Sequence, residues 1–282
     1  MPGNDTGSSG EIMCINNENI RMVRPKKSLG QHFLRDDNIA SRIAGYLDPQ
    51  VPRVLEIGPG TGVLTRHILE QHSFDLKVIE IDNESVEYLT ARFPELHGRI
   101  LHDDFLRTDL TCLFHPADAI QIIGNFPYNI SSQILFRVLE YKDLVKQVTG
   151  MFQQEVAARI ASPPGLRQYG ILSVLMQAWY EVDYLFTVDE TVFFPPPKVK
   201  SGVIRFRRNG VKSLECNEDL FVRVVKTTFN QRRKTIRNSI RGLARTGIQT
   251  PSSLLDLRPE QCSVDQFVEL TRLVDGNSPE IS

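Results

Sequence analysis

Short apolar segments alternate with amphipathic ones through the first half of this chain, and this alternation limits the fold more than any other feature. Segments rich in Val, Ile and Leu, as buried strands are, lie at 53–58, 77–82, 99–104, 119–125 and 145–152. Apolar residues at helical spacing occupy 63–71, 84–93 and 131–141. Strands that alternate with helices form a parallel sheet with helices on both faces. The sequence therefore predicts an α/β domain.

The second half of the chain changes character near residue 210. Two further strand patterns, 181–188 and 202–208, flank the proline-rich loop 193–200 and are expected to pair antiparallel at the edge of the same sheet. After residue 210 only helical patterns remain, at 218–229, 232–245 and 264–274. We therefore expect a disordered tail over 1–20, an α/β domain over 21–209 and a small helical domain over 210–282.

The composition of the chain excludes several classes of protein. Of 282 residues, 41% are apolar and 24% charged, which is typical of a globular protein. No apolar run approaches the roughly 18 residues of a membrane span and no signal peptide is apparent, so we expect a cytoplasmic protein without membrane contact. The four cysteines lie far apart and the histidines lack metal-ligand spacing, so no metal is expected.

Charge is distributed unevenly along the chain. The whole sequence has a net charge of −1, but the segment 198–245 holds fourteen Lys or Arg against three acidic residues, a net charge of +11. The remainder is therefore strongly acidic. Such an asymmetry favours a surface that faces a polyanion.

Polar residues follow successive predicted strands. The first strand leads into Gly58, Gly60 and Gly62, the second ends at Glu80, the third at Asp103-Asp104 and the fourth at Asn125. Glycines let a ligand approach the backbone, and a carboxylate about 20 residues on can bind both ribose hydroxyls. This pattern favours a nucleoside-bearing cofactor. The alternative is that the glycines only form a tight turn and the carboxylates only cap the helices that follow, which would give the same sequence pattern. A dinucleotide site is less favoured, because the loop lacks the third glycine of GxGxxG.

The segment Asn125-Phe126-Pro127-Tyr128 suits chemistry on an exocyclic amine of a base. The Asn125 side-chain oxygen and the Pro127 carbonyl can each accept an N–H hydrogen bond and so direct the nitrogen lone pair. Tyr128 can stack on the base, with Phe193 as the candidate for its other face. An aromatic clamp implies an extruded or single-stranded nucleotide. The alternative is an ordinary β-turn, in which Asn and Pro are common.

These motifs are shared with a known family. The sequence closely resembles the ribosomal RNA adenine N6-dimethyltransferases, in particular those that modify the small-subunit rRNA, and the resemblance spans roughly residues 24 to 275. The matching segments are 26–34, 56–62, 80–82, Asp104, 125–129, 154–157, 193–201 and 229–238.

The resemblance implies a fold, a cofactor and a reaction. The fold is a Rossmann-like S-adenosylmethionine-dependent methyltransferase domain with a small all-helical C-terminal domain. The reaction is dimethylation of the N6 amino groups of two adjacent adenosines near the 3′ end of 16S rRNA, within a small ribosomal subunit or its precursor, by a monomer that serves subunit biogenesis. The implied cofactor contacts are His32 and Leu34 at the methionine end, Gly58 in the loop, Glu80 at the ribose, Asp104 at the adenine, and Asn125 at both cofactor and target.

Basic residues supply a candidate RNA surface. The spacing of Arg233, Arg237, Arg241 and Arg245 predicts one face of a helix over 232–245, on which the guanidinium groups would repel one another unless an anion neutralises them. A solvated face is the alternative. The residues assigned to RNA binding are Lys26, Lys27, Lys198, Arg232, Arg233, Lys234 and Arg237.

Three other functions remain open at this point. A large-subunit rRNA adenine methylase of the macrolide-resistance kind shares the cofactor loop and an Asn-x-Pro-Tyr motif. A non-catalytic RNA-binding assembly or transcription factor on the same fold would not need Asn125. A nicotinamide-dependent dehydrogenase would be stabilised by NAD rather than by S-adenosylmethionine.

Overall fold

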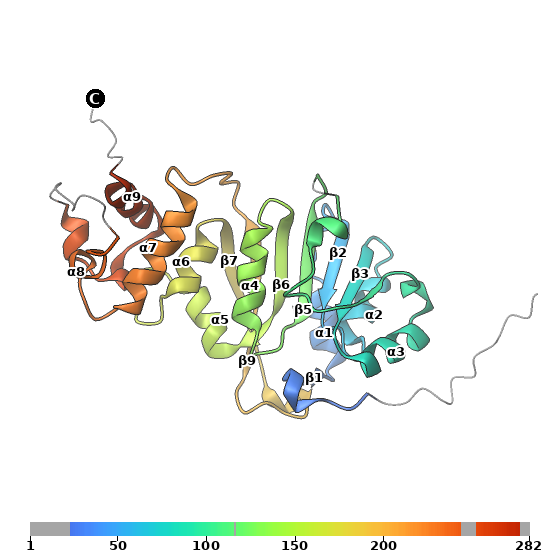
Figure 1. Ribbon diagram of the computed structural model, residues 1–282. Coiled ribbons are helices and arrows are strands. Elements are labelled where there is room, and N and C mark those ends of the chain that lie inside the picture. The colour runs from blue at the N-terminus through green and yellow to red at the C-terminus, as the bar shows by residue number, and fades with distance from the viewer. Residues whose placement is uncertain (1–22, 116, 244–251, 277–282) are drawn as a thin grey trace, which may run out of the picture.

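A seven-stranded, mostly parallel sheet forms the centre of the molecule (Figure 1). The structure is a computed structural model and describes residues 23–115, 117–243 and 252–276. The strand order is β4-β3-β2-β5-β6-β9-β7, with β9 and β7 antiparallel, which confirms the predicted antiparallel edge. The strands are β2 (Arg53–Ile57), β3 (Asp75–Glu80), β4 (Ile100–His102), β5 (Ile120–Asn125), β6 (Val145–Gln153), β7 (Tyr180–Val188) and β9 (Ser201–Arg208).

Both faces of the sheet are buried, because successive strand residues point to opposite sides. In β2, Leu55 and Ile57 belong to one apolar cluster and Val54 to another. The cluster around Val54 includes helices α1 (Asp37–Ala44), α2 (Val63–Leu69) and α3 (Asn83–Arg92). The cluster around Leu55 includes α4 (Ser131–Glu140), α5 (Gln154–Ile160) and α6 (Ile171–Gln177). The predicted α/β architecture is thus confirmed.

The C-terminal helices gather at one end of the molecule, beyond α6 (Figure 1). Their apolar residues belong to the same continuous cluster as Leu55, and the Trp179 and Phe221 rings meet edge to face with centroids 5.9 Å apart. The domain boundary near residue 210 therefore stays a prediction. These helices are α7 (Glu218–Asn230), α8 (Ile236–Ser239) and α9 (Val264–Asp275).

The predicted helix over 232–245 is wrong in the part that the structure describes. Only Ile236–Ser239 is helical there. The backbone N–H of Ile236 donates to the carbonyl of Leu257, 2.9 Å away, instead of to the preceding turn. Arg233, Arg237 and Arg241 therefore do not share one continuous helix face. Arg245 lies outside the described residues, as does the tail predicted over 1–20.

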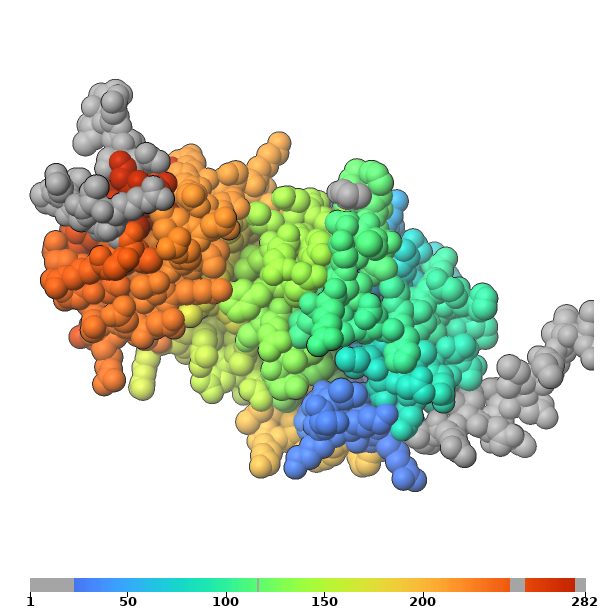
Figure 2. All heavy atoms as spheres, in the orientation of Figure 1, coloured from blue at the N-terminus to red at the C-terminus, as the bar shows by residue number. Residues whose placement is uncertain are grey.

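A two-stranded ribbon that the sequence did not predict joins two distant segments. β1 (Phe33–Leu34) pairs antiparallel with β8 (Phe193–Phe194), so that Phe33 lies opposite Phe194 and Leu34 opposite Phe193. The ribbon places the N-terminal segment beside the proline-rich loop at one edge of the molecule, seen as blue beside gold in Figure 2. The described residues also contain short 3₁₀ helices at Lys27–Leu29, Pro94–Leu96, Leu110–Cys112, Glu190–Val192, Ser253–Asp256 and Pro259–Gln261.

Among the described residues, no helix is both long and apolar enough to cross a membrane.

Candidate active site

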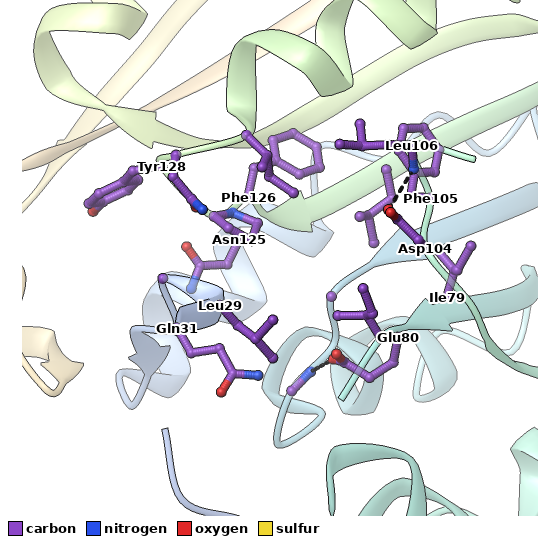
Figure 3. Close-up of a pocket in the computed structure, with 18 of the residues that line it drawn as sticks. Leu29, Gln31, Ile79, Glu80, Asp104, Phe105, Leu106, Asn125, Phe126 and Tyr128 are labelled. Carbon is purple, nitrogen blue, oxygen red and sulfur yellow. Dashed lines mark hydrogen bonds between the residues drawn. The ribbon is translucent and has the colours of Figure 1, made fainter. Parts of the chain in front are cut away.

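A cavity of about 290 Å³ lies at the carboxyl ends of β2, β3, β4 and β5, where open α/β sheets bind their ligands. The N-terminal segment forms another part of its wall. Figure 3 shows Asn125 and Tyr128 on one side of the cavity and Glu80 and Asp104 on the other, with Leu29 contributed by the N-terminal segment. The sheet therefore brings together side chains from three strand ends that the sequence keeps 21 to 24 residues apart.

The glycines after β2 serve two different purposes. All three have positive φ, between +57° and +74°, which glycine adopts without strain. A Cβ at Gly58 would meet no atom within 4 Å, whereas one at Gly60 would lie 2.7 Å from the Phe33 ring and one at Gly62 2.3 Å from Phe93. Gly60 and Gly62 are thus required for packing, and Gly58 leaves backbone open to the cavity.

Glu80 is positioned by the backbone around it. Its carboxylate accepts the N–H groups of Gly60, at 3.1 Å, and Asp82, at 2.9 Å. The residue is only 4% exposed, and this burial raises the pKa of the Glu80 carboxyl despite the two hydrogen bonds. A carboxylate already oriented at the strand end can accept hydrogen bonds from ligand hydroxyl groups.

Asp104 and two apolar neighbours form the far end of the cavity. One carboxylate oxygen of Asp104 accepts the N–H of Leu106 at 2.9 Å. The Asp103 carboxylate accepts hydrogen bonds from the Asp104 N–H and from the Thr108 hydroxyl, so both of its oxygens are used locally. Ile81 lines the same cavity and is 49% exposed, which is unusual for an isoleucine. Sequence reasoning missed Ile81 and Leu106, although an apolar residue directly after Glu80 was a usable signal.

Asn125 is held in a single orientation by the N-terminal segment. Its side-chain N–H donates to the backbone carbonyl of His32 at 2.7 Å, so its oxygen remains available as an acceptor. The carbonyl of Pro127 accepts the N–H of Ile130 at 3.2 Å and has a second lone pair free. The cavity thus presents two acceptor oxygens within one four-residue segment.

Tyr128 and His32 pack together at the mouth of the cavity. Their ring centroids are 5.7 Å apart with an interplanar angle of 28°. The Tyr128 hydroxyl hydrogen-bonds the Ser201 hydroxyl at 2.6 Å, and burial raises the Tyr128 pKa. His32 Nδ1 lies 2.7 Å from the Pro195 carbonyl, so this nitrogen carries the proton. His32 therefore orients both Asn125 and Tyr128, through its backbone and its ring respectively.

Two residues assigned to the site by sequence lie elsewhere. Leu34 and Phe193 are 4% and 3% exposed and belong to the apolar cluster under the β1–β8 ribbon. Neither lines the cavity. The β1–β8 ribbon buries both side chains away from the cavity, so this placement does not support the predicted stacking role of Phe193 or the predicted methionine contact of Leu34, and both stay predictions.

The residues assigned to RNA binding fall into two groups. Lys26 pairs with Asp82 and Glu84, Arg232 with Glu260, and Arg237 with Asp256. Lys234 donates to the Gln231 side chain at 3.0 Å. Within the described part of the chain, Lys27, Lys198 and Arg233 have no ion-pair partner. These three are the cations most available to an external anion.

No group of three or more His, Cys, Asp or Glu side chains in residues 23–115, 117–243 and 252–276 is arranged to hold a metal ion.

Known proteins resemble the chain over nearly its whole length. Residues 22–275 match the family model for ribosomal RNA adenine dimethylase. The ribosomal RNA small subunit methyltransferase A of Parabacteroides distasonis is 58% identical over 89% of this chain and 94% of its own. The protein of the same name from Bacteroides thetaiotaomicron is 54% identical over 91% of this chain and 96% of its own.

Solved structures show the same fold. A dimethyladenosine transferase from Plasmodium falciparum has a TM-score of 0.69 at 22% identity and covers 87% of this chain and 98% of its own. The 23S rRNA methyltransferase ErmE has a TM-score of 0.60 at 26% identity and covers 86% of this chain and 99% of its own. The family match over residues 22–275 and the relatives of 54–58% identity show that the chain belongs to the ribosomal RNA adenine dimethylase family.

Proposed function

We propose that this enzyme transfers methyl groups from S-adenosylmethionine to the N6 atoms of two adjacent adenosines near the 3′ end of 16S rRNA, two groups to each. The observation that carries the proposal is the fixed amide of Asn125, which presents an acceptor oxygen beside the Pro127 carbonyl. The choice of the small subunit is supported by the names of relatives that are 54–58% identical to this chain.

The cavity residues fit the cofactor that this family uses. Open backbone at Gly58 gives room for a ligand, and the oriented carboxylate of Glu80 is the group that would bind ribose hydroxyls. Ile81 offers an exposed apolar surface for the adenine, and Asp104 an acceptor for its amino group. When bound, S-adenosylmethionine supplies an electrophilic methyl group.

The reaction needs a better nucleophile than a base amine in solution, because the N6 lone pair is delocalised into the ring. Hydrogen bonds from N6 to Asn125 Oδ1 and to the Pro127 carbonyl would hold both protons and aim the lone pair at the methyl group. Tyr128 would hold the base by stacking on the face of its ring that His32 leaves open. The nitrogen would become positively charged as its bond to the methyl group forms, while the methyl–sulfur bond breaks and leaves a neutral thioether. The nitrogen would then lose a proton, so no strong base is required.

The setting of the reaction follows from the proposed substrate. Both adenosines must be unstacked to enter the cavity, so the substrate is a structured RNA with an accessible end, in a small subunit or its precursor. Lys27, Lys198 and Arg233 are the cations we assign to its phosphates first. We place a monomeric enzyme in the cytoplasm, where subunits are assembled.

The deciding experiment is tritiated methyl transfer from S-adenosylmethionine to undermethylated small subunits, with large subunits in parallel and mass mapping of the product. Adjacent N6,N6-dimethyladenosines in the small subunit support the proposal. Label in the large subunit would instead indicate the activity named for ErmE. Cofactor binding without label in either subunit would indicate an assembly factor.

A further inference from the structure

A second hollow, of about 470 Å³, adjoins the active-site cavity and shares Phe33 with it. It is lined by the residues around β1, by the start of α2, by the end of α3 and by Phe194 of the proline-rich loop. We infer that this hollow binds a phosphate and base of the substrate RNA outside the target adenosine. The inference rests on the proposed function, because it assigns the hollow to that RNA.

The charge of the hollow points to an anion. Its lining contains four arginines, Arg24, Arg35, Arg66 and Arg92, and no Asp or Glu. Arg66 pairs with Asp37, which is not part of the lining. Arg24, Arg35 and Arg92 have no carboxylate partner in the described residues. Guanidinium groups without internal partners bind phosphate oxygens well.

Aromatic rings lie among these arginines. Phe194 is 45% exposed, and the Arg35 guanidinium sits 4.3 Å from its ring centroid. Arg92 lies 5.7 Å from the centroid of Phe93, and Tyr88 also lines the hollow. Phe93 is buried and Tyr88 is partly buried, so Phe194 is the exposed ring. An exposed ring beside guanidinium groups is a surface on which an unstacked base stacks. A ligand that uses both the arginines and the exposed ring would carry a phosphate and a base, as a nucleotide does.

The position of the hollow assigns the nucleotide to RNA rather than to the cofactor. Without a carboxylate, it lacks the group that the first cavity has in Glu80 for ribose hydroxyls. Phe194 pairs across the ribbon with Phe33, and the next residue, Pro195, accepts the hydrogen bond of His32 beside Tyr128. A strand whose target base is at Tyr128 can therefore continue across the ribbon into the hollow.

The test measures equilibrium binding of the full chain to undermethylated small subunits and to a single-stranded oligoribonucleotide over a range of salt. One variant carries Arg35→Gln and Arg92→Gln, and another carries Phe194→Ala, with Phe194→Trp as its conservative partner. The matched control is Arg53→Gln with Arg99→Gln, which removes the same charge at the amino ends of the parallel strands. Affinity for S-adenosylmethionine is measured in every variant.

We expect the arginine pair to weaken RNA binding and to lower the salt slope by about 1.4, since each phosphate contact on a single strand contributes about 0.7. Phe194→Ala should weaken binding about fivefold to a hundredfold, as loss of one stacked base does, and Phe194→Trp should restore it. The control variant should bind RNA as tightly as the unsubstituted chain does. The affinity for S-adenosylmethionine should be unchanged in every variant. In methyl transfer, KM for the subunit should rise with kcat preserved.

Several results would overturn the inference. RNA affinity equal to that of the unsubstituted chain, or an equal loss in the control, would show that the hollow does not contact RNA. Loss of S-adenosylmethionine affinity would assign it to the cofactor site. Binding of adenosine monophosphate alone as tightly as the oligoribonucleotide would make it a site for free nucleotides. Because binding is measured apart from methyl transfer, failure of the proposed reaction remains distinguishable from failure of this site.

Discussion

At the scale of single residues, Asn125 supplies the hydrogen-bond acceptor that we propose orients the target amine. Its amide N–H donates to the His32 carbonyl, so the side-chain oxygen of this cavity-lining residue is left as an acceptor before any substrate arrives. Replacing Asn125 by Ala should therefore lower kcat by about 10²–10³-fold, the usual cost of one preorganised hydrogen-bonding group. Single-turnover methyl transfer measures this, and calorimetry should show weakened but measurable binding of S-adenosylmethionine. Activity retained by Asn125→Ala would remove the amide from the mechanism.

Glu56 carries a second residue-scale prediction. Burial raises the pKa of this carboxyl to about 8, with a smaller contribution from the charge of Glu80, while the Thr65 hydroxyl donates to it at 2.6 Å. The folded chain therefore keeps a proton on Glu56 that the unfolded chain releases near pH 4.3. Between these two pH values the folded state holds one more proton on Glu56 than the unfolded state does. The contribution of Glu56 to the free energy of unfolding therefore falls as pH rises, by at most about 1.4 kcal/mol per pH unit.

Glu56→Gln should remove this dependence, because its uncharged amide can still accept the Thr65 hydrogen bond. Urea unfolding at several pH values between 5.5 and 8 should show the free energy of the variant gaining on the unsubstituted chain as pH rises. Glu95→Gln, at an exposed carboxyl, serves as the control. Parallel curves for Glu56→Gln and the unsubstituted chain would mean that Glu56 is ionised in the folded protein.

At the scale of elements, the N-terminal segment is fastened across the cavity. Lys26 pairs with Asp82 and Glu84, and Gln31 contacts Asp82 at 3.4 Å. Burial opposes the charge on Asp82, yet the hydrogen bonds from Lys26, Gln31 and Ser85 lower its pKa overall. The ion pair therefore links the segment that carries His32 to the end of β3, which carries Glu80.

Lys26→Ala should loosen this link. We expect faster amide hydrogen exchange over residues 27–33 and a few-fold weaker binding of S-adenosylmethionine, with little change in global stability because the pair is partly exposed. Lys27→Ala is the matched control, since Lys27 is exposed and has no ion-pair partner in the described chain. Equal exchange rates in both variants would show that the pair does not fasten the segment.

The same elements show how far sequence reasoning reaches. The parallel strands and the meeting of Gly58, Glu80, Asp104 and Asn125 were predictable, because apolar periodicity marks strands and parallel strand ends share one edge. The β1–β8 ribbon was not predictable, since pairing between residues 159 and 161 positions apart leaves no local pattern. The helix expected over 232–245 failed because the Ile236 N–H bonds the distant Leu257 carbonyl. The same ribbon buries the side chains of Leu34 and Phe193, a placement that the sequence did not predict, and their roles at the site stay predictions.

At the scale of the whole molecule, the C-terminal helices and the sheet share one core. The chain has a single tryptophan, Trp179, which is 3% exposed and packs against Phe221 of α7. Trp179 follows α6, on the α/β side of the boundary that the sequence places at residue 210. Its fluorescence therefore reports directly on the contact between the two parts, whereas far-UV circular dichroism follows the secondary structure of both.

Phe221 is fully buried, so Phe221→Ala should lower the free energy of unfolding by about 3–5 kcal/mol, the cost of removing a large side chain from a packed core. Because the core is continuous, we expect Trp179 fluorescence and circular dichroism to give coincident urea transitions in the unsubstituted chain. Leu166→Ala, at a side chain that is 47% exposed, should change stability little. Separate transitions, with fluorescence changing first, would instead establish residues 210–282 as an independently folding domain.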